Sequence, residues 1–118
     1  MLTVAVLKEK GSRVEEGLAR CMNNETFYLR LVGMALKDGN FAALKSALEQ
    51  GDAKAAFESA HALKGVLGNL ALTPLFEPAS AITELLRGAA PGSPSPPETA
   101  PLAAALFTAL ADHLSLAE

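Results

Sequence analysis

The choice of hydrophobic residues limits this chain to helical folds more than any other feature of its sequence. Alanine and leucine account for 23 and 20 of its 118 residues, whereas valine and isoleucine account for only 5 and 1. Alanine and leucine are strong helix formers, and β-branched residues favour strands. A β-sandwich, a barrel or a doubly wound parallel sheet is therefore not expected. Half of the residues are hydrophobic and 19% are charged, which predicts a packed core and excludes wholesale disorder.

Charge, cysteine content and hydrophobic runs limit the ligands and the cellular location that this protein can have. The chain has 10 basic and 13 acidic residues, a net charge of −3, whereas nucleic-acid-binding proteins usually carry a basic surplus. Its single cysteine, Cys21, cannot form an internal disulfide. The sequence contains no run of 18 apolar residues, so it predicts no segment that spans a bilayer. A signal peptide has its positive charges before the apolar stretch, whereas here the first lysines follow it. We expect a cytoplasmic protein that binds neither nucleic acid nor membrane.

Helical periodicity and capping residues divide the chain into successive helices. The pattern predicts a short helix within residues 1–10 and then helices over 13–22, 25–37, 41–49, 53–72, 73–87 and 98–116. Their predicted starts are a capping box from Ser12 to Glu15, N-caps at Asn24, Asn40 and Asp52, and Thr73 as an N-cap before Pro74.

The connections between these helices indicate how they pack. Residues 88–97 hold four prolines in ten positions and predict an irregular, mobile loop. The other connections are short, which favours antiparallel neighbours. We therefore expect one all-α domain over residues 1–118, an up-and-down four-helix bundle with an additional short N-terminal helix or helices.

One segment, residues 60–70, departs from what a plain bundle needs. With 100° per residue, the apolar side chains of residues 56–70 converge on one stripe that would face the core. His61 points away from that stripe. Lys64, Gly65 and Gly68 follow His61 by three, four and seven positions and lie on its outward side. The core stripe consists of Ala56, Ala60, Leu63, Leu67 and Leu70.

The two glycines and the histidine indicate a particular chemistry. A glycine inside a helix costs about 0.5–1 kcal/mol relative to alanine, and this chain uses alanine freely. An exposed glycine lets another surface approach the backbone, although a neighbouring helix could also use the space. A neutral imidazole is a nucleophile that can accept a phosphoryl group, and a lysine one turn away can offset its charge. Because the sequence carries no P-loop, kinase glycine loop or Mg²⁺ cradle, the group would come from another protein and pass to a third.

The segment Ala60-His61-Ala62-Leu63-Lys64-Gly65, followed by Gly68 and Asn69, resembles the signature of histidine-containing phosphotransfer (HPt) domains. The resemblance is strongest over residues 14–87. It implies a four-helix bundle that relays phosphate between the aspartates of two receiver domains in multistep two-component signalling.

The resemblance also implies roles for individual residues. His61 would be the phosphoacceptor, Lys64 the cation that faces the phosphate, and Gly65 and Gly68 the surface that admits the partner. Partners would be receiver domains of response regulators or hybrid sensor kinases, which would supply Mg²⁺. The chain itself would need no cofactor or metal and would have no kinase activity or ATP site.

Other interpretations stay open at this point. The domain could be a degenerate adaptor that binds receiver domains or other proteins without carrying phosphate, and His61 could be an ordinary surface histidine. An enzyme with His61 as general base would lack a second catalytic group. Lys64 could merely extend along the edge of the core stripe.

Four residues outside this site carry separate expectations. We expect His113 to be exposed or at an edge, and Phe27 and Tyr28 to be core aromatics. We expect Cys21 to pack as a small hydrophobe, because its position gives no zinc-site spacing.

Overall fold

The computed structural model describes residues 1–117 and contains seven helices in that range. Each predicted helix is present, with ends that differ from the prediction by a few residues at most, and only Glu118 lies outside the described range. The helices are α1 (Val4–Glu9), α2 (Val14–Arg20), α3 (Glu25–Leu36), α4 (Gly39–Glu49), α5 (Ala53–Asn69), α6 (Thr73–Leu86) and α7 (Thr99–Leu116).

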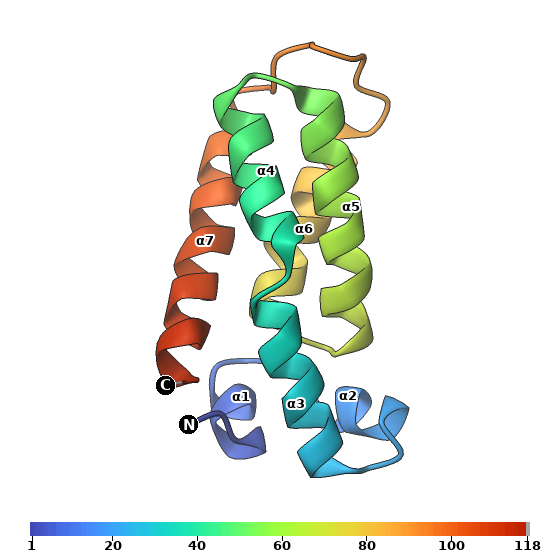
Figure 1. Cartoon of the computed structure of the whole chain (residues 1–118), viewed down its shortest axis with the longest axis vertical. Helices are drawn as coiled ribbons and strands as arrows, with labels where there is room; N and C mark the ends of the chain where they lie inside the picture. The colour runs from blue at the N-terminus through green and yellow to red at the C-terminus, as the bar shows by residue number, and fades with distance from the viewer. Residues whose placement is uncertain (118) are drawn as a thin grey trace.

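Helices α4 to α7 form an up-and-down four-helix bundle, as predicted (Figure 1). Each of these helices packs against the next along the chain. The first and last helices of the bundle also meet, because the rings of Phe41 on α4 and Phe107 on α7 lie edge to face with centroids 6.4 Å apart. Helix α3 continues the line of α4, and α1 and α2 lie beside α3 at that end of the molecule (Figure 1). The short N-terminal helices thus extend the bundle at one end.

Side-chain caps fix the starts of four helices: Thr3 caps α1, and the other three caps begin α3, α4 and α5. Asn24 and Asp52 each accept a hydrogen bond from an amide in the first turn of the helix that follows, which confirms them as the caps of α3 and α5. The cap of α4 differs from the prediction. Asp38 accepts the amide hydrogen of Asn40 at 2.8 Å, so the helix begins at Gly39, two residues earlier than a cap at Asn40 predicts.

The predicted capping box before α2 is wrong. Arg13 precedes the helix without a side-chain cap, and Ser12 is buried with no hydrogen-bond partner for its hydroxyl among the described residues. Glu15 does not reach back to the helix start, because Lys8 on α1 binds its carboxylate at 2.7 Å. Thr73 is likewise not a cap, since it is itself the first residue of α6.

A buried tyrosine joins α3 to the end of α5. Tyr28 has no exposed surface, and its hydroxyl donates a hydrogen bond to the carbonyl oxygen of Leu70 at 2.8 Å. Gly17 on α2 passes so close that a Cβ atom there would lie 2.5 Å from Tyr28 Cε1 and 2.6 Å from the Leu70 carbonyl oxygen. Only glycine fits at this crossing, so α2 and α3 together hold the C-terminal end of the helix that carries His61.

The ionisation of Tyr28 should report on this junction, because the chain has one tyrosine and no tryptophan. Burial raises the pKa of Tyr28 from 10.0 to about 12. In the folded protein the tyrosinate absorbance should therefore rise with a midpoint near pH 12, and after denaturation near pH 10. The stabilising contribution is complete below pH 10 and is lost as the pH rises toward 12, because only the unfolded state gives up its proton in that window. A midpoint near pH 10 in the folded protein would contradict the buried hydrogen bond.

Two side chains lie elsewhere than predicted, and one lies as expected. Phe27 is 41% exposed instead of buried, because Tyr28 next to it takes the core position of α3. His113 is buried, with 1% of its surface exposed, and its Nδ1 donates to the carbonyl oxygen of Ala109 at 2.7 Å. That bond within α7 satisfies one ring nitrogen and lets the helix turn the histidine inward. Cys21 is buried, as predicted for a small hydrophobe.

The proline-rich loop and α7 complete the bundle. The loop is irregular, as predicted, and it is tied to the start of α5 because the Ala53 amide donates to the Ser93 carbonyl oxygen at 2.8 Å. Among the helices of residues 1–117, α7 alone is long and apolar enough to cross a membrane, by length and composition only. In this fold it packs against α6 and contributes Leu106 and His113 to the interior.

Candidate functional site

Helix α5 presents one face to the core and the opposite face to solvent, as its sequence predicts. The core stripe, defined above, is buried along its whole length: its members are between 0% and 4% exposed. His61 lies on the opposite face and is exposed. The buried stripe therefore anchors α5, so that the middle of this helix can hold an exposed histidine and two glycines without fraying.

The imidazole of His61 contacts an aromatic ring on its own helix. Phe57, one turn earlier on α5, meets it edge to face with ring centroids 5.5 Å apart and an interplanar angle of 69°. Within residues 1–117, no hydrogen bond or ion pair engages the His61 ring. No donor or acceptor within residues 1–117 therefore competes for either ring nitrogen, so the lone pair of one of them is available for nucleophilic attack.

The predicted phosphate-facing cation, Lys64, lies at the edge of the site and is paired. Its Nζ lies 3.6 Å from Oε2 of Glu84 on α6, and a third of its side chain is exposed. Glu84 in turn binds Arg87 at 2.6 Å, and the Arg87 guanidinium carbon lies 5.5 Å from the centre of the Phe57 ring. Lys64 and His61 are neighbours on one helix face, with Cβ atoms roughly 5–6 Å apart at this spacing. The structure thus brings together the predicted histidine and lysine, and adds three side chains.

The two glycines differ. A Cβ atom on Gly65 would meet nothing within 4 Å, so the backbone one turn after His61 is open to solvent. A Cβ atom on Gly68 would lie 2.9 Å from Cε1 of Phe76 on α6. Close packing between α5 and α6 therefore accounts for Gly68, the alternative that the sequence left open, and Gly65 alone forms the open backbone beside the histidine.

An apolar groove begins beside Gly65 and runs between α3 and α5. Its lining includes Leu31 and Met34 from α3 and Gly65 and Val66 from α5, and Met34 is 64% exposed. Leu31 is half-buried and Met34 is largely exposed, although both belong to the apolar helical spacing of α3. The groove therefore continues the open backbone at Gly65 into an exposed apolar surface next to His61.

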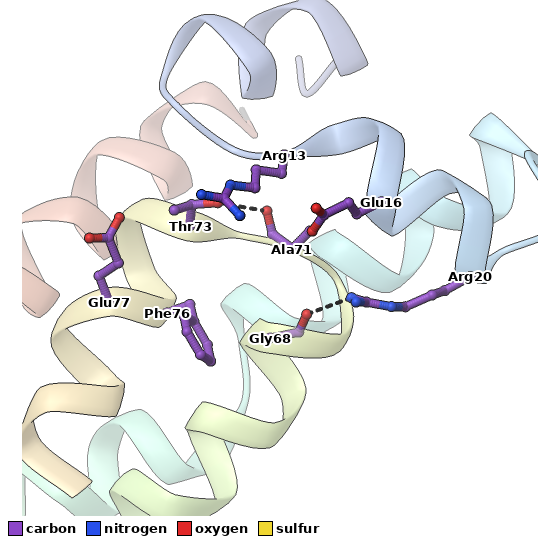
Figure 2. Close-up of a pocket in the computed structure, with 8 residues that line it drawn as sticks. All are labelled: Arg13, Glu16, Arg20, Gly68, Ala71, Thr73, Phe76 and Glu77. Carbon is purple, nitrogen blue, oxygen red and sulfur yellow. Dashed lines mark hydrogen bonds between the residues drawn. The ribbon is translucent and has the colours of Figure 1, made fainter. Parts of the chain in front are cut away.

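A second depression lies at the end of α5 and has a structural explanation (Figure 2). Arg20 on α2 reaches across it and donates from Nη1 to the carbonyl oxygens of Gly68 and Asn69, at 2.8 and 3.0 Å. A cation at this position satisfies the last carbonyl groups of α5 and complements its dipole. Arg13, Glu16 and Glu77 also line the depression, so it holds two arginines and two glutamates. The hydrogen bonds of Arg20 thus secure the C-terminal end of α5, and we assign no catalytic or binding role to this depression.

Sequence reasoning missed Phe57, Glu84 and Arg87. The sequence could have predicted the contact of Phe57 with His61, because Phe57 precedes His61 by four residues and so lies on the same helix face. Glu84 and Arg87 form an i,i+3 pair, but only the packing of α6 against α5 shows that they lie beside Lys64. No group of histidine, cysteine, aspartate and glutamate side chains in residues 1–117 is arranged to hold a metal ion.

Fold and site together define a helical bundle that exposes an imidazole from the middle of a helix to solvent, with a lysine one turn away. A comparison with protein-family models agrees: the Hpt domain family matches residues 38–116, more than half of the chain. The chain belongs to the Hpt domain family, whose members serve as histidine-phosphotransfer modules in two-component signalling. The match runs from the cap of α4 to the last residue of α7, so it covers the bundle and His61 and leaves α1–α3 outside. The searches of curated proteins and of solved structures gave no significant match.

Proposed function

We propose that this chain is a phosphorelay intermediate that accepts a phosphoryl group on His61 from a receiver-domain aspartate and passes it to the aspartate of another. The observation that carries the proposal is the free, exposed imidazole of His61 beside the open backbone of Gly65. A protein surface can reach this imidazole directly, as transfer between two proteins requires.

The proposed step is a reversible displacement at phosphorus. The lone pair of one His61 ring nitrogen attacks the phosphorus of the aspartyl phosphate, and the P–O bond to the aspartate carboxyl group breaks with its electron pair. The aspartate is released as a carboxylate, and the other ring nitrogen of His61 gives its proton to solvent. The reverse sequence of events delivers the group to the next aspartate. Mg²⁺, which supports the charge of the transferring oxygens, belongs to the receiver domain in this proposal.

Two features beside His61 support the docking of such a partner. Gly65 leaves room for a receiver loop to come close to the helix, and the apolar groove next to it offers a surface for the partner to bury. Lys64 lies one turn from the histidine, where its ammonium group can offset the phosphoryl charge. We therefore place the receiver domain over Gly65 and along the groove.

The first test is whether the chain takes up label from a phosphorylated receiver domain. We expect the wild type to acquire an acid-labile, base-stable phosphoryl label and His61→Gln to acquire none, because glutamine has no nucleophilic ring nitrogen. His113→Gln is a matched control on the second histidine, which is buried, and it should label like the wild type if it folds.

The same experiment separates the carrier from the adaptor. Tight binding of the receiver with no label on the wild type would favour a degenerate Hpt domain that docks without carrying phosphate. Equal label on the wild type and on His61→Gln would assign the phosphoacceptor to another residue. Circular dichroism of His61→Gln should match the wild type, because the substituted side chain is exposed.

A further inference from the structure

One carboxylate on α6 is shared between Lys64 and a second cation. Glu84 Oε2 lies 2.6 Å from Arg87 Nη2 and 3.6 Å from Lys64 Nζ, and Glu84 Oε1 accepts from Arg87 Nε at 3.4 Å. Arg87 therefore contacts both carboxylate oxygens, whereas the Lys64 contact is longer than a direct N–H···O hydrogen bond. Lys64 can leave Glu84 without leaving the carboxylate unpaired.

The contacts of Arg87 keep this carboxylate on the His61 side of the bundle. The guanidinium group lies over the ring of Phe57, and Phe57 meets the ring of His61. The hydrogen bond from Arg87, together with the smaller effect of the Lys64 charge, lowers the pKa of Glu84. Glu84 is therefore a negative charge at neutral pH, and it is held beside the cation that the phosphoryl group would need.

Phosphorylation would place two anions in competition for one ammonium group. A phosphoryl group adds roughly two negative charges, and on His61 it would lie one helical turn from Lys64. We propose that Glu84 is a positioning residue that competes with the phosphoryl group for Lys64 and so weakens the phosphohistidine, which makes the group easier to pass on. This inference rests on the proposed function and deepens it.

The test is the equilibrium of phosphoryl exchange between a purified phosphorylated receiver domain and this chain. Glu84→Gln should shift that equilibrium toward the phosphohistidine by roughly two- to fivefold, the range expected for one exposed charge, and the shift should shrink as salt is added. Glu77→Gln is the matched control. It removes the same charge from an exposed residue of α6 two turns earlier, and it should leave the equilibrium unchanged.

A double-mutant cycle with Lys64→Gln separates competition for Lys64 from other effects of Glu84. If Glu84 acts through Lys64, the shift caused by Glu84→Gln should fall to less than half when Lys64 is absent. A purely structural role would change the thermal midpoint but not a salt-dependent equilibrium. The same shift with and without Lys64, or no shift at all, overturns the inference and leaves the proposed function standing. Absence of label on the wild type overturns both.

Discussion

Gly65→Arg is expected to leave the bundle folded and to slow phosphoryl transfer by about tenfold or more. The backbone at Gly65 is open, so an arginine there extends into solvent and displaces no neighbour. The side chain would instead occupy the space through which a receiver domain reaches His61. A loss of only 1.4 kcal/mol in the docked complex corresponds to a factor of ten. The measurement is the rate of label transfer from a phosphorylated receiver domain, with the thermal midpoint as the check on folding.

A second open glycine provides the control. Gly33 on α3 also has nothing within 4 Å of a Cβ position, but it lines a different depression, with Leu2 and Leu114. Gly33→Arg should therefore transfer phosphate like the wild type. Gly65→Ala should stabilise the fold by about 0.5–1 kcal/mol, since nothing hinders the added methyl group. Wild-type transfer by Gly65→Arg would contradict the docking surface placed at this glycine.

Leu67→Ala is expected to reduce the free energy of unfolding by about 2–5 kcal/mol. Leu67 is fully buried in the core stripe, two residues after Gly65, and its loss would leave a cavity between α5 and its neighbours. The urea midpoint should fall while the slope of the transition stays the same. Leu85→Ala, on a half-buried leucine of α6, is the matched control and should lose clearly less. A negligible change in the urea midpoint of Leu67→Ala would mean that α5 does not turn the face with Leu67 toward the core.

Local patterns were sufficient to predict the helices and the face of α5. The core stripe repeats at the helical period over four turns, so it fixes which side of α5 is buried and places His61 opposite. The same logic failed for α3, where Phe27 and Met34 are exposed although they are apolar. That helix has apolar residues on more than one face, and only packing against α2 and α5 selects Tyr28 for the core.

Contacts between helices could not be predicted from the sequence. Gly65 and Gly68 are the same residue type and lie on the same side of α5. Phe76 of α6 nevertheless packs on Gly68, whereas nothing lies within 4 Å of a Cβ position at Gly65. The Lys64–Glu84 pair likewise depends on how far α6 is shifted along α5, which no local pattern encodes. His113 was misplaced because its polarity suggested solvent, whereas a hydrogen bond within its own helix satisfies Nδ1 of the buried ring.

The central claim is that His61 holds a phosphoryl group which a receiver domain can take away. The most direct measurement starts from the labelled wild-type chain, purified free of its donor, and adds an unphosphorylated receiver domain with Mg²⁺. We predict that label leaves His61 and appears on the receiver aspartate in equal amount. Label that stays on this chain, or that is released only as inorganic phosphate, would contradict the relay.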